Sequence, residues 1–430
     1  MAALSLPMLG SLVAEPLTGL VDTLLVARLG ATQLAALGVA TTLLSSVLWA
    51  FNFLGIGTQT AVARADGEGR SADGAGTTAV ALALAVGIGL ALWLLASLAV
   101  EPAARFMGAA AGTLDDAASY LRIRLVSAPA VLVMMVAFGA LRGLQDMRTP
   151  LWIAVGANVL NVLLDVVLIF GVGPFPRLEL VGAAWASSVS LYFGAGVALA
   201  LLVRRLSLPH RIAWQRMKGL LVVGRDLLVR TAALLAFVAL GVRSATLIGP
   251  EAGDAHALVR SVFVFSAFVL DAYAHAAQSL VSYFLGQRRV AAARRVAVVG
   301  LQWSLATGVV AAVAMVAATP LALQALPDEA RGLAAGAWLL AALAQPISAV
   351  SFATDGIHWG AGDYAYLRRV MLLSSLLGGA ALLALDASGR TTLEGIWVVT
   401  IGWLAARGLL GGLRVWPGLG AAPLASGRQG

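Results

Sequence analysis

The chain has 430 residues, of which 60% are hydrophobic and 12% charged, and its formal net charge is +8. Because soluble domains carry about 25% charged residues, this composition excludes a soluble enzyme or binding module and predicts a polytopic membrane protein. The sequence contains no cysteine, which excludes disulfide bonds and thiol chemistry.

Twelve membrane-spanning helices are expected. A spanning helix needs about 20 apolar residues, and uncharged stretches such as 29–63, 75–100, 180–203, 296–327 and 332–354 reach this length. With the apolar segments that hold one or two ionisable groups, the expected centres are residues 16, 48, 88, 131, 161, 192, 238, 270, 308, 343, 377 and 403. The sequence therefore predicts an all-α polytopic membrane protein with no soluble domain.

Most of the 29 Lys and Arg residues lie in alternate connections, and the longest basic connection, 204–225, falls at the chain midpoint. By the positive-inside rule, these connections and both termini are predicted to be cytoplasmic. The predicted organisation is an N-lobe of six helices at 1–203, a basic linker at 204–228, a C-lobe of six helices at 229–413 and a cytoplasmic tail at 414–430.

The two halves resemble each other in sequence. Gln59–Gly67 and Gln278–Gly286 share the spacing of Gln and Gly, and Gly143–Asp146 and Gly360–Asp363 share a loop pattern at nearly the same offset. Because each half has an even number of spans, the two repeats must have the same orientation in the membrane. Transporters are commonly built from such repeats.

Two carboxylates, Asp22 and Asp165, interrupt apolar runs of the first and fifth spans. An ionised Asp at the bilayer centre costs roughly 2.5–3.5 kcal/mol, so such a residue usually faces a bundle interior or a cavity. Glu15, Thr18 and Asp22 share one helix face, as do Asn158, Asn161 and Asp165. The two polar stripes predict a shared polar interior, and no intramembrane Arg of this half is expected at their depth. In the alternative, each Asp only bonds to a neighbouring helix or pairs with an Arg.

Burial and a second carboxylate nearby both favour a carboxyl group that gains and loses a proton, so a proton site is predicted. Asn161 and Ser187 could complete its hydrogen bonds. Na⁺ is the competing ion, because carboxylate, amide and hydroxyl oxygens also suit a hard cation.

A second polar face lies on the eighth span, where Asp271, His275 and Gln278 follow helical spacing. One hypothesis makes these residues a substrate or proton site of the C-lobe. The favoured alternative is an internal hydrogen-bonded trio that fixes helix packing.

Several segments together resemble the multidrug and toxic compound extrusion (MATE) transporters, in the branch of DNA-damage-inducible protein F (DinF). These segments are PMLGSLVAEPLTGLVDTLLVARLG, LRGLQDMRTPL, NVLNVLLDVVLIFG, VGAAWAS, LDAYAHAAQSLVSYFLG and DGIHWGAGDYAYLRR. The resemblance covers nearly the whole chain, and it is the combination of segments that is specific.

The resemblance implies a two-lobed antiporter that exports amphipathic or cationic organic compounds by alternating access, driven by H⁺ or Na⁺. It places ion coupling on Asp22, Asn161, Asp165 and Ser187. It also implies that the first helix bends at a proline that matches Pro7, and Pro16 is the second candidate for this bend.

The chain departs from proton-coupled relatives at Phe138, where they can carry an Asn. The network could instead be completed by Glu15 or Asn158. No metal or organic cofactor is expected besides the coupling ion, H⁺ or Na⁺.

The expected partners are a small organic substrate and the lipid bilayer, without nucleic acid. The protein is expected to be a monomer in the inner membrane of a bacterium. A flippase of lipid-linked precursors is the alternative function, for which a cationic cavity is expected. A membrane enzyme lacks support, because the sequence carries no catalytic motif.

Overall fold

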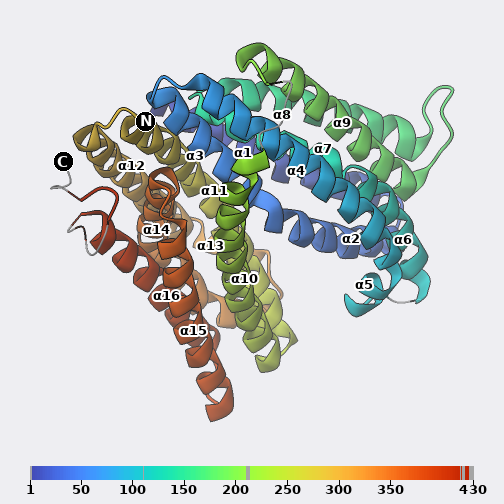
Figure 1. Ribbon diagram of the computed structural model, residues 1–430. Coiled ribbons are helices and arrows are strands. Elements are labelled where there is room, and N and C mark those ends of the chain that lie inside the picture. The colour runs from blue at the N-terminus through green and yellow to red at the C-terminus, as the bar shows by residue number, and fades with distance from the viewer. Residues whose placement is uncertain (1, 110, 210–213, 417, 419–421, 426–430) are drawn as a thin grey trace. The chain divides into compact units, whose positions relative to one another are not determined.

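The computed structural model describes the whole chain except residues 1, 110, 210–213, 417, 419–421 and 426–430, and the side chains of residues 2, 3, 15 and 111 are also left out. All regular structure in the described part is helical (Figure 1). In a bilayer, helices satisfy every backbone hydrogen bond within the segment. The helices are α1 (Ala2–Ala27), α2 (Ala31–Trp49), α3 (Phe53–Gly67), α4 (Ser71–Leu98), α5 (Val100–Phe106), α6 (Ala111–Val126), α7 (Ala128–Gly143), α8 (Arg148–Phe170), α9 (Glu179–Arg205), α10 (Met217–Ile248), α11 (Pro250–Gly286), α12 (Val290–Ala317), α13 (Thr319–Gln324), α14 (Asp328–Ala361), α15 (Tyr364–Ser388) and α16 (Leu393–Val415), with short 3₁₀ turns at Ala50–Asn52 and Trp214–Arg216.

Among the described residues, 11 spans are long and apolar enough to cross a membrane, and α2 and α3 together form one of them. The twelfth span is the pair α6 and α7, which bends by 47° at its break. The break lies at Ser127, two residues before Pro129 in the first turn of α7. Proline has no N–H and its ring clashes with the preceding turn, so a continuous helix is disfavoured here.

The chain divides into two compact units, Leu6–Gly224 and Arg225–Gly430, with the first five residues joined to the second unit. We call them the N-lobe and the C-lobe. The linker predicted at 204–228 is partly helical, since α10 already begins at Met217, and residues 210–213 of it lie outside the described part. The predicted tail starts inside α16, and most of its remainder is likewise not described.

Each lobe contains an equivalent close contact between two helices. In the N-lobe, a Cβ added to Gly143 of α7 would come 2.7 Å from the carbonyl oxygen of Gln59 on α3. In the C-lobe, a Cβ added to Gly360 of α14 would come 2.5 Å from the carbonyl oxygen of Gln278 on α11. These four residues belong to the segments that the sequence repeat aligns. Small residues allow helix backbones to approach closely in membranes, so the repeat preserves a packing contact.

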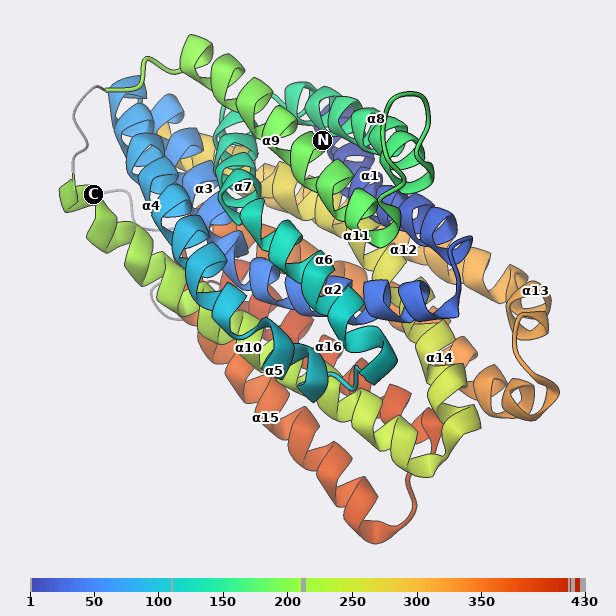
Figure 2. The same cartoon turned by 90° about the vertical axis from the view of Figure 1, so that its right-hand side faces the viewer.

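In the N-lobe, α8 and α9 lie side by side along most of their length (Figure 2). The outward face of α8 carries Trp152, Val159 and Leu163, which are exposed, whereas its opposite face is buried. This division places the polar residues of α8 toward the interior of the lobe.

Candidate functional site

The N-lobe polar cluster lies where α1 meets α8. A Cβ added to Gly10 of α1 would lie 2.8 Å from the Leu151 side chain, which shows how closely the two helices pack. On α8, the buried residues Ala157, Asn161 and Asp165 are spaced by four, so they form one helix face. Of the predicted stripe, Asn161 and Asp165 are buried and Asn158 is half-buried.

Asp22 and Asp165 come together at the centre of this cluster, with their carboxyl groups within hydrogen-bonding reach of each other. Asp165 is fully buried, and its Oδ1 has no hydrogen-bond partner among the described residues. Two carboxylates this close cannot both be ionised without a large electrostatic cost. The arrangement can therefore hold one proton between two acids.

Asn161 links the carboxylates to a third helix. In the orientation that gives both carboxamide atoms a hydrogen-bond partner, Asn161 Nδ2 donates to Oδ1 of Asp22 at 3.2 Å. In the same orientation, Asn161 Oδ1 accepts from the Ser187 N–H of α9 at 3.2 Å. In the other orientation its Nδ2 lies 3.4 Å from the Ser187 hydroxyl. The structure thus brings together four of the predicted residues.

Asn158 has a different contact, since its Nδ2 donates to the Ala14 carbonyl of α1 at 2.9 Å. The Thr18 hydroxyl donates to the same carbonyl at 3.0 Å. The Asn158 bond holds α8 against α1 about two turns away from the carboxylates, whereas the Thr18 bond lies within α1. The side chain of Glu15, the other predicted substitute, lies outside the described residues.

The expectation that no arginine reaches the depth of the acidic pair is wrong. The Arg124 guanidinium on α6 interacts electrostatically with both Asp22 and Asp165, and it also donates to the Ser127 hydroxyl at 3.1 Å. From the sequence, the fourth span is expected to centre on residue 131, with Arg124 at its outer end. The break at Ser127 instead makes α6 part of the span, which places a positive charge beside the acids.

Pro7 and Pro16 both lie inside α1, which remains one helix through them. Phe138, the departure from proton-coupled relatives, is buried on α7, and the Arg142 guanidinium lies 5.6 Å from its ring centroid. Arg142 also donates to the Ser11 hydroxyl of α1 at 3.1 Å. A cation and a hydroxyl therefore connect α7 to α1 near this position.

In the C-lobe, the three predicted residues of α11 do lie together. His275 Nδ1 is 3.1 Å from Oε1 of Gln278, and its Nε2 is 3.7 Å from a carboxylate oxygen of Asp271. His275 and Gln278 are buried, whereas Asp271 is partly exposed. The contacts make a connected trio within one helix.

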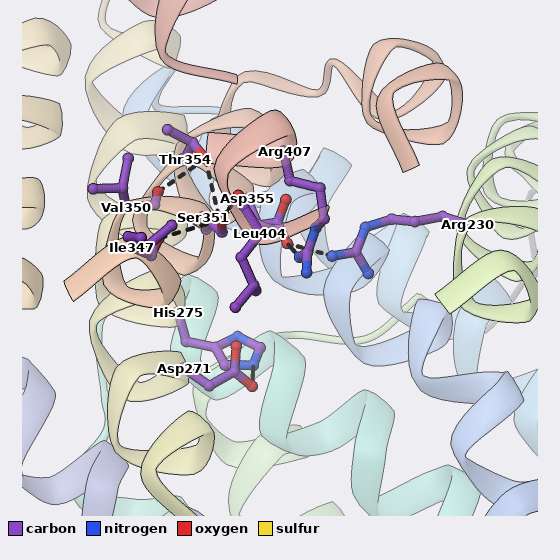
Figure 3. A network of polar contacts seen from close by, with 10 residues as sticks. All are labelled: Arg230, Asp271, His275, Ile347, Val350, Ser351, Thr354, Asp355, Leu404 and Arg407. Carbon is purple, nitrogen blue, oxygen red and sulfur yellow. Dashed lines mark hydrogen bonds and ion pairs between the residues drawn. The ribbon is translucent and has the colours of Figure 1, made fainter. Parts of the chain in front are cut away.

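A buried ionic cluster in the same lobe was missed by the sequence analysis. Asp355 of α14 accepts hydrogen bonds on one oxygen, Oδ2, from Arg230 of α10 and from Arg407 of α16, the latter at 2.8 Å (Figure 3). The uncharged stretch 332–354 stops one residue before Asp355. The helix in fact continues to Ala361. The sequence does contain a signal for this cluster, because Asp355, Arg230 and Arg407 all lie in or beside apolar segments of the same half.

Local packing explains why the cluster forms. The Ser351 hydroxyl of α14 donates to the Leu404 carbonyl of α16 at 2.6 Å, and a Cβ on Gly408 would meet the Ser351 Oγ at 3.2 Å. Asp355 and Arg407 lie one turn further along their helices and so face each other. On the other side of the cluster, the Trp359 ring lies 5.5 Å from the Arg230 guanidinium and 5.6 Å from the His275 ring.

A third ionic cluster lies at the loop between α14 and α15. Arg414 donates to both oxygens of Asp363, at 2.7 and 3.2 Å, and His358 Nδ1 is 3.5 Å from the same carboxylate. Burial would raise the pKa of Asp363, but the bonds and charges of His358 and Arg414 outweigh it and hold that pKa below its usual range. In the N-lobe, the corresponding loop residue Asp146 pairs with Arg205 at 3.5 Å.

Among the described residues, no group of three or more His, Cys, Asp or Glu side chains could hold a metal ion. The ionisable groups of the spans are instead gathered into pairs and triads of acids and bases. Such clusters suit the binding of a proton or of a charged solute, and they offer no constellation for covalent chemistry.

Comparison with known proteins agrees with this description. A model of the MatE family matches residues 7–167 and 229–382. Among its relatives, Protein DETOXIFICATION 44, chloroplastic, of Arabidopsis thaliana is 32% identical, over 98% of this chain and 84% of the relative. DNA damage-inducible protein F of Escherichia coli K12 is 29% identical, over 94% of this chain and 89% of the relative. A crystal structure of a MATE protein in the straight conformation has the same fold, with a TM-score of 0.87 at 20% identity over 96% of this chain and 94% of that one.

Two six-helix repeats with acidic residues buried inside them define a multi-pass membrane transporter, not an enzyme. The chain belongs to the MatE family of multidrug and toxic compound efflux transporters. This confirms the resemblance seen in the sequence and the twelve-helix fold that it implied.

Proposed function

We propose that this protein is a proton-coupled antiporter that exports amphipathic or cationic organic compounds by alternating access, with Asp22 and Asp165 as the coupling site. The observation that carries this proposal is the contact between the two carboxyl groups inside the N-lobe, completed by Asn161 and Ser187. An intramembrane acid that is buried beside a second acid has its charged form disfavoured, so it can bind and release a proton as its surroundings change.

The choice of H⁺ over Na⁺ is supported by the ligands present. A hard cation needs a shell of several oxygen ligands at once. The positive charge of Arg124 beside both acids further disfavours a bound metal cation. A proton needs only one carboxyl oxygen, and Asp165 Oδ1 is buried with no hydrogen-bond partner among the residues that the structure describes.

In the proposed cycle, a proton enters from outside and neutralises the acidic pair. Loss of that charge weakens the bond from Asn161 to Asp22 and releases α1 from α8 on the side of the acids. A bend of α1 at Pro7 or Pro16 then reshapes the N-lobe, so that a cationic cargo leaves outward. Release of the proton to the inside restores the charge and the original helix.

A Na⁺-coupled exporter of the same fold is the first alternative. A flippase of lipid-linked precursors is the second, and the observation that favours it is the pair of buried arginines around Asp355. For either exporter, we propose a monomer in the inner membrane of a bacterium with both termini in the cytoplasm. The supporting observation is the gathering of basic residues in alternate connections.

The test is exchange of ethidium against protons in proteoliposomes, with either a pH gradient or a Na⁺ gradient imposed and the membrane potential clamped. We expect transport with the pH gradient alone, and its loss in Asp22→Asn and Asp165→Asn. The matched control is Asp115→Asn, an exposed acid on α6 of the same lobe, which should transport normally. Transport by both variants at the normal rate would overturn the coupling site, and transport driven by Na⁺ alone would overturn the ion.

A further inference from the structure

We propose that the Arg230–Asp355–Arg407 cluster of the C-lobe is a binding site for the carboxylate group of an amphipathic organic anion. With this site, the protein would export organic anions as well as the cations that suit the acidic N-lobe. As a statement about exported compounds it rests on the proposed transport function, whereas the binding itself does not.

The first argument is the charge of the cluster. Two guanidinium groups face one carboxylate, which leaves one positive charge in excess, and Arg230, Asp355 and Arg407 are only 8%, 5% and 4% exposed. An uncompensated charge in such surroundings is costly. A bound carboxylate would neutralise this excess.

The second argument is hydrogen bonding. Both arginines use an Nη2 to bond the same Asp355 oxygen. The Nε of each arginine is buried and has no hydrogen-bond partner among the described residues. A guanidinium has five N–H donors in a fixed plane, and its Nε edge is suited to a second, bidentate carboxylate. Buried donors without partners are rare in proteins, and here two occur on the two residues that carry the excess charge.

The third argument is the way the arginines are held. The Arg407 guanidinium lies 4.5 Å from the ring centroid of Trp403, which in turn stacks on Phe237 at 4.5 Å, while Arg230 lies against Trp359. Aromatic faces fix the guanidinium planes and leave their edges free to bind. Figure 3 shows both guanidinium groups converging on Asp355, with His275 and Asp271 nearby.

A purely structural ion pair and a ligand site differ in what Asp355 does. In a structural triad, Asp355 is the partner that the arginines need, and its removal only damages the lobe. In a ligand site, Asp355 competes with the anion for the same donors. Removal of its charge should then strengthen anion binding.

The experiment measures equilibrium binding of radiolabelled 4-phenylbutyrate to the purified full-length protein in detergent, without any ion gradient. The competitors are the neutral 4-phenylbutyramide and the cationic 4-phenylbutylamine, which have the same ring and chain. We expect saturable binding that only the unlabelled carboxylate displaces. Arg230→Met and Arg407→Met should each weaken binding about tenfold or more, since a hydrogen bond between charged groups is lost.

The decisive variant is Asp355→Asn, which should bind the carboxylate more tightly than the wild type. If the variant loses thermal stability, addition of 4-phenylbutyrate should recover more of the loss than the amide does. Arg243→Met is the matched control, because Arg243 is an exposed arginine of the same lobe paired with Asp386 at 3.0 Å, and its binding should be unchanged.

Weaker or unchanged binding in Asp355→Asn would overturn the assignment, as would displacement by the amide as readily as by the carboxylate. Where an Arg→Met protein does not fold, Arg→Lys keeps the charge but not the planar donors and should show intermediate binding. Because no proton gradient is present, a failed coupling site would leave these results unchanged. Failure of the binding test would in turn leave proton-driven ethidium export intact.

Discussion

Gly139 of α7 lies so close to α3 that a Cβ added to it would come 2.3 Å from the carbonyl oxygen of Gly55. The C-lobe repeats this relationship, since a Cβ on Gly356 of α14 would come 2.3 Å from the carbonyl oxygen of Ala274 on α11. In both lobes the second close glycine follows one turn later, at Gly143 and Gly360. The two repeats therefore keep the same backbone-to-backbone contact between equivalent helices.

Substitution of Gly139 or Gly356 by alanine should destabilise the protein. The added methyl group meets backbone, which cannot move aside as a side chain can, and overpacking of this kind typically costs about 1–3 kcal/mol. The measurement is the midpoint of thermal unfolding of the purified protein. Gly156→Ala and Gly402→Ala are controls, because a Cβ at either position meets nothing within 4 Å. Equal midpoints for both pairs of variants would contradict the close packing.

The ion pair of Asp363 should make stability depend on pH in acid. The pKa of this carboxyl is lowered in the folded protein, and its unfolded value is about 3.9. The carboxyl therefore stabilises the fold fully above the unfolded pKa, and this contribution is lost as the pH falls through the folded pKa. Asp363→Asn should thus lower the unfolding midpoint near neutral pH, with a difference from the wild type that shrinks below about pH 4.

Arg414→Met provides the check on this assignment, because it removes the bidentate partner and leaves the carboxylate buried. It should destabilise the protein at neutral pH, and its deficit should also shrink on acidification. A deficit of Asp363→Asn that stays the same size down to the acid limit would show that the charge of Asp363 contributes nothing.

Substitutions of the two asparagines of α8 should distinguish a role in proton coupling from a role in helix packing. Asn161→Ala removes the donor to Asp22, so proton-driven ethidium export should fall strongly. Asn158→Ala removes a bond to the Ala14 carbonyl and should mainly lower stability, by about 1 kcal/mol. The measurements are transport in proteoliposomes and the unfolding midpoint for each variant. The assignment of roles would be wrong if Asn158→Ala abolished transport in a stable protein while Asn161→Ala transported normally.

Pro16→Ala should stabilise α1 and slow transport. Proline is about 3 kcal/mol less favourable than alanine inside a helix, and it leaves the carbonyl one turn earlier without a donor. Its replacement should raise the unfolding midpoint and hinder the bend that the proposed cycle requires. Pro250→Ala is the control, because Pro250 occupies the first turn of α11, where proline is tolerated. An unchanged transport rate in a stabilised Pro16→Ala protein would exclude Pro16 as the hinge.

Properties that depend on local sequence were predictable. The spans follow from the length of apolar runs, and the inward faces of α1 and α8 follow from helical spacing and from the cost of a charge in lipid. The shared segments at Gln59 and Gln278 indicated two repeats, because their offset is constant along the chain. The shared polar face of Asp271, His275 and Gln278 likewise follows from helical spacing, since these residues lie on adjacent turns of one helix.

Partnerships between helices could not be predicted in the same way. The bond from Asn158 to Ala14 and the approach of Arg124 to Asp22 depend on which helices pack together and at what depth. The break at Ser127 changed that depth for Arg124, although Pro129 gave a local signal for it.

The sequence by itself determined the class of protein, the number of spans, the duplication and the acids of the N-lobe, because the bilayer imposes length and polarity on each helix separately. Only the tertiary structure decided that Asp355 meets Arg230, 125 residues before it, and Arg407, 52 residues after it. The physical reason is that a charged residue inside an apolar run can be recognised from the sequence of one helix. Its partner depends on how the helices pack, here through small residues such as Ser351 and Gly408.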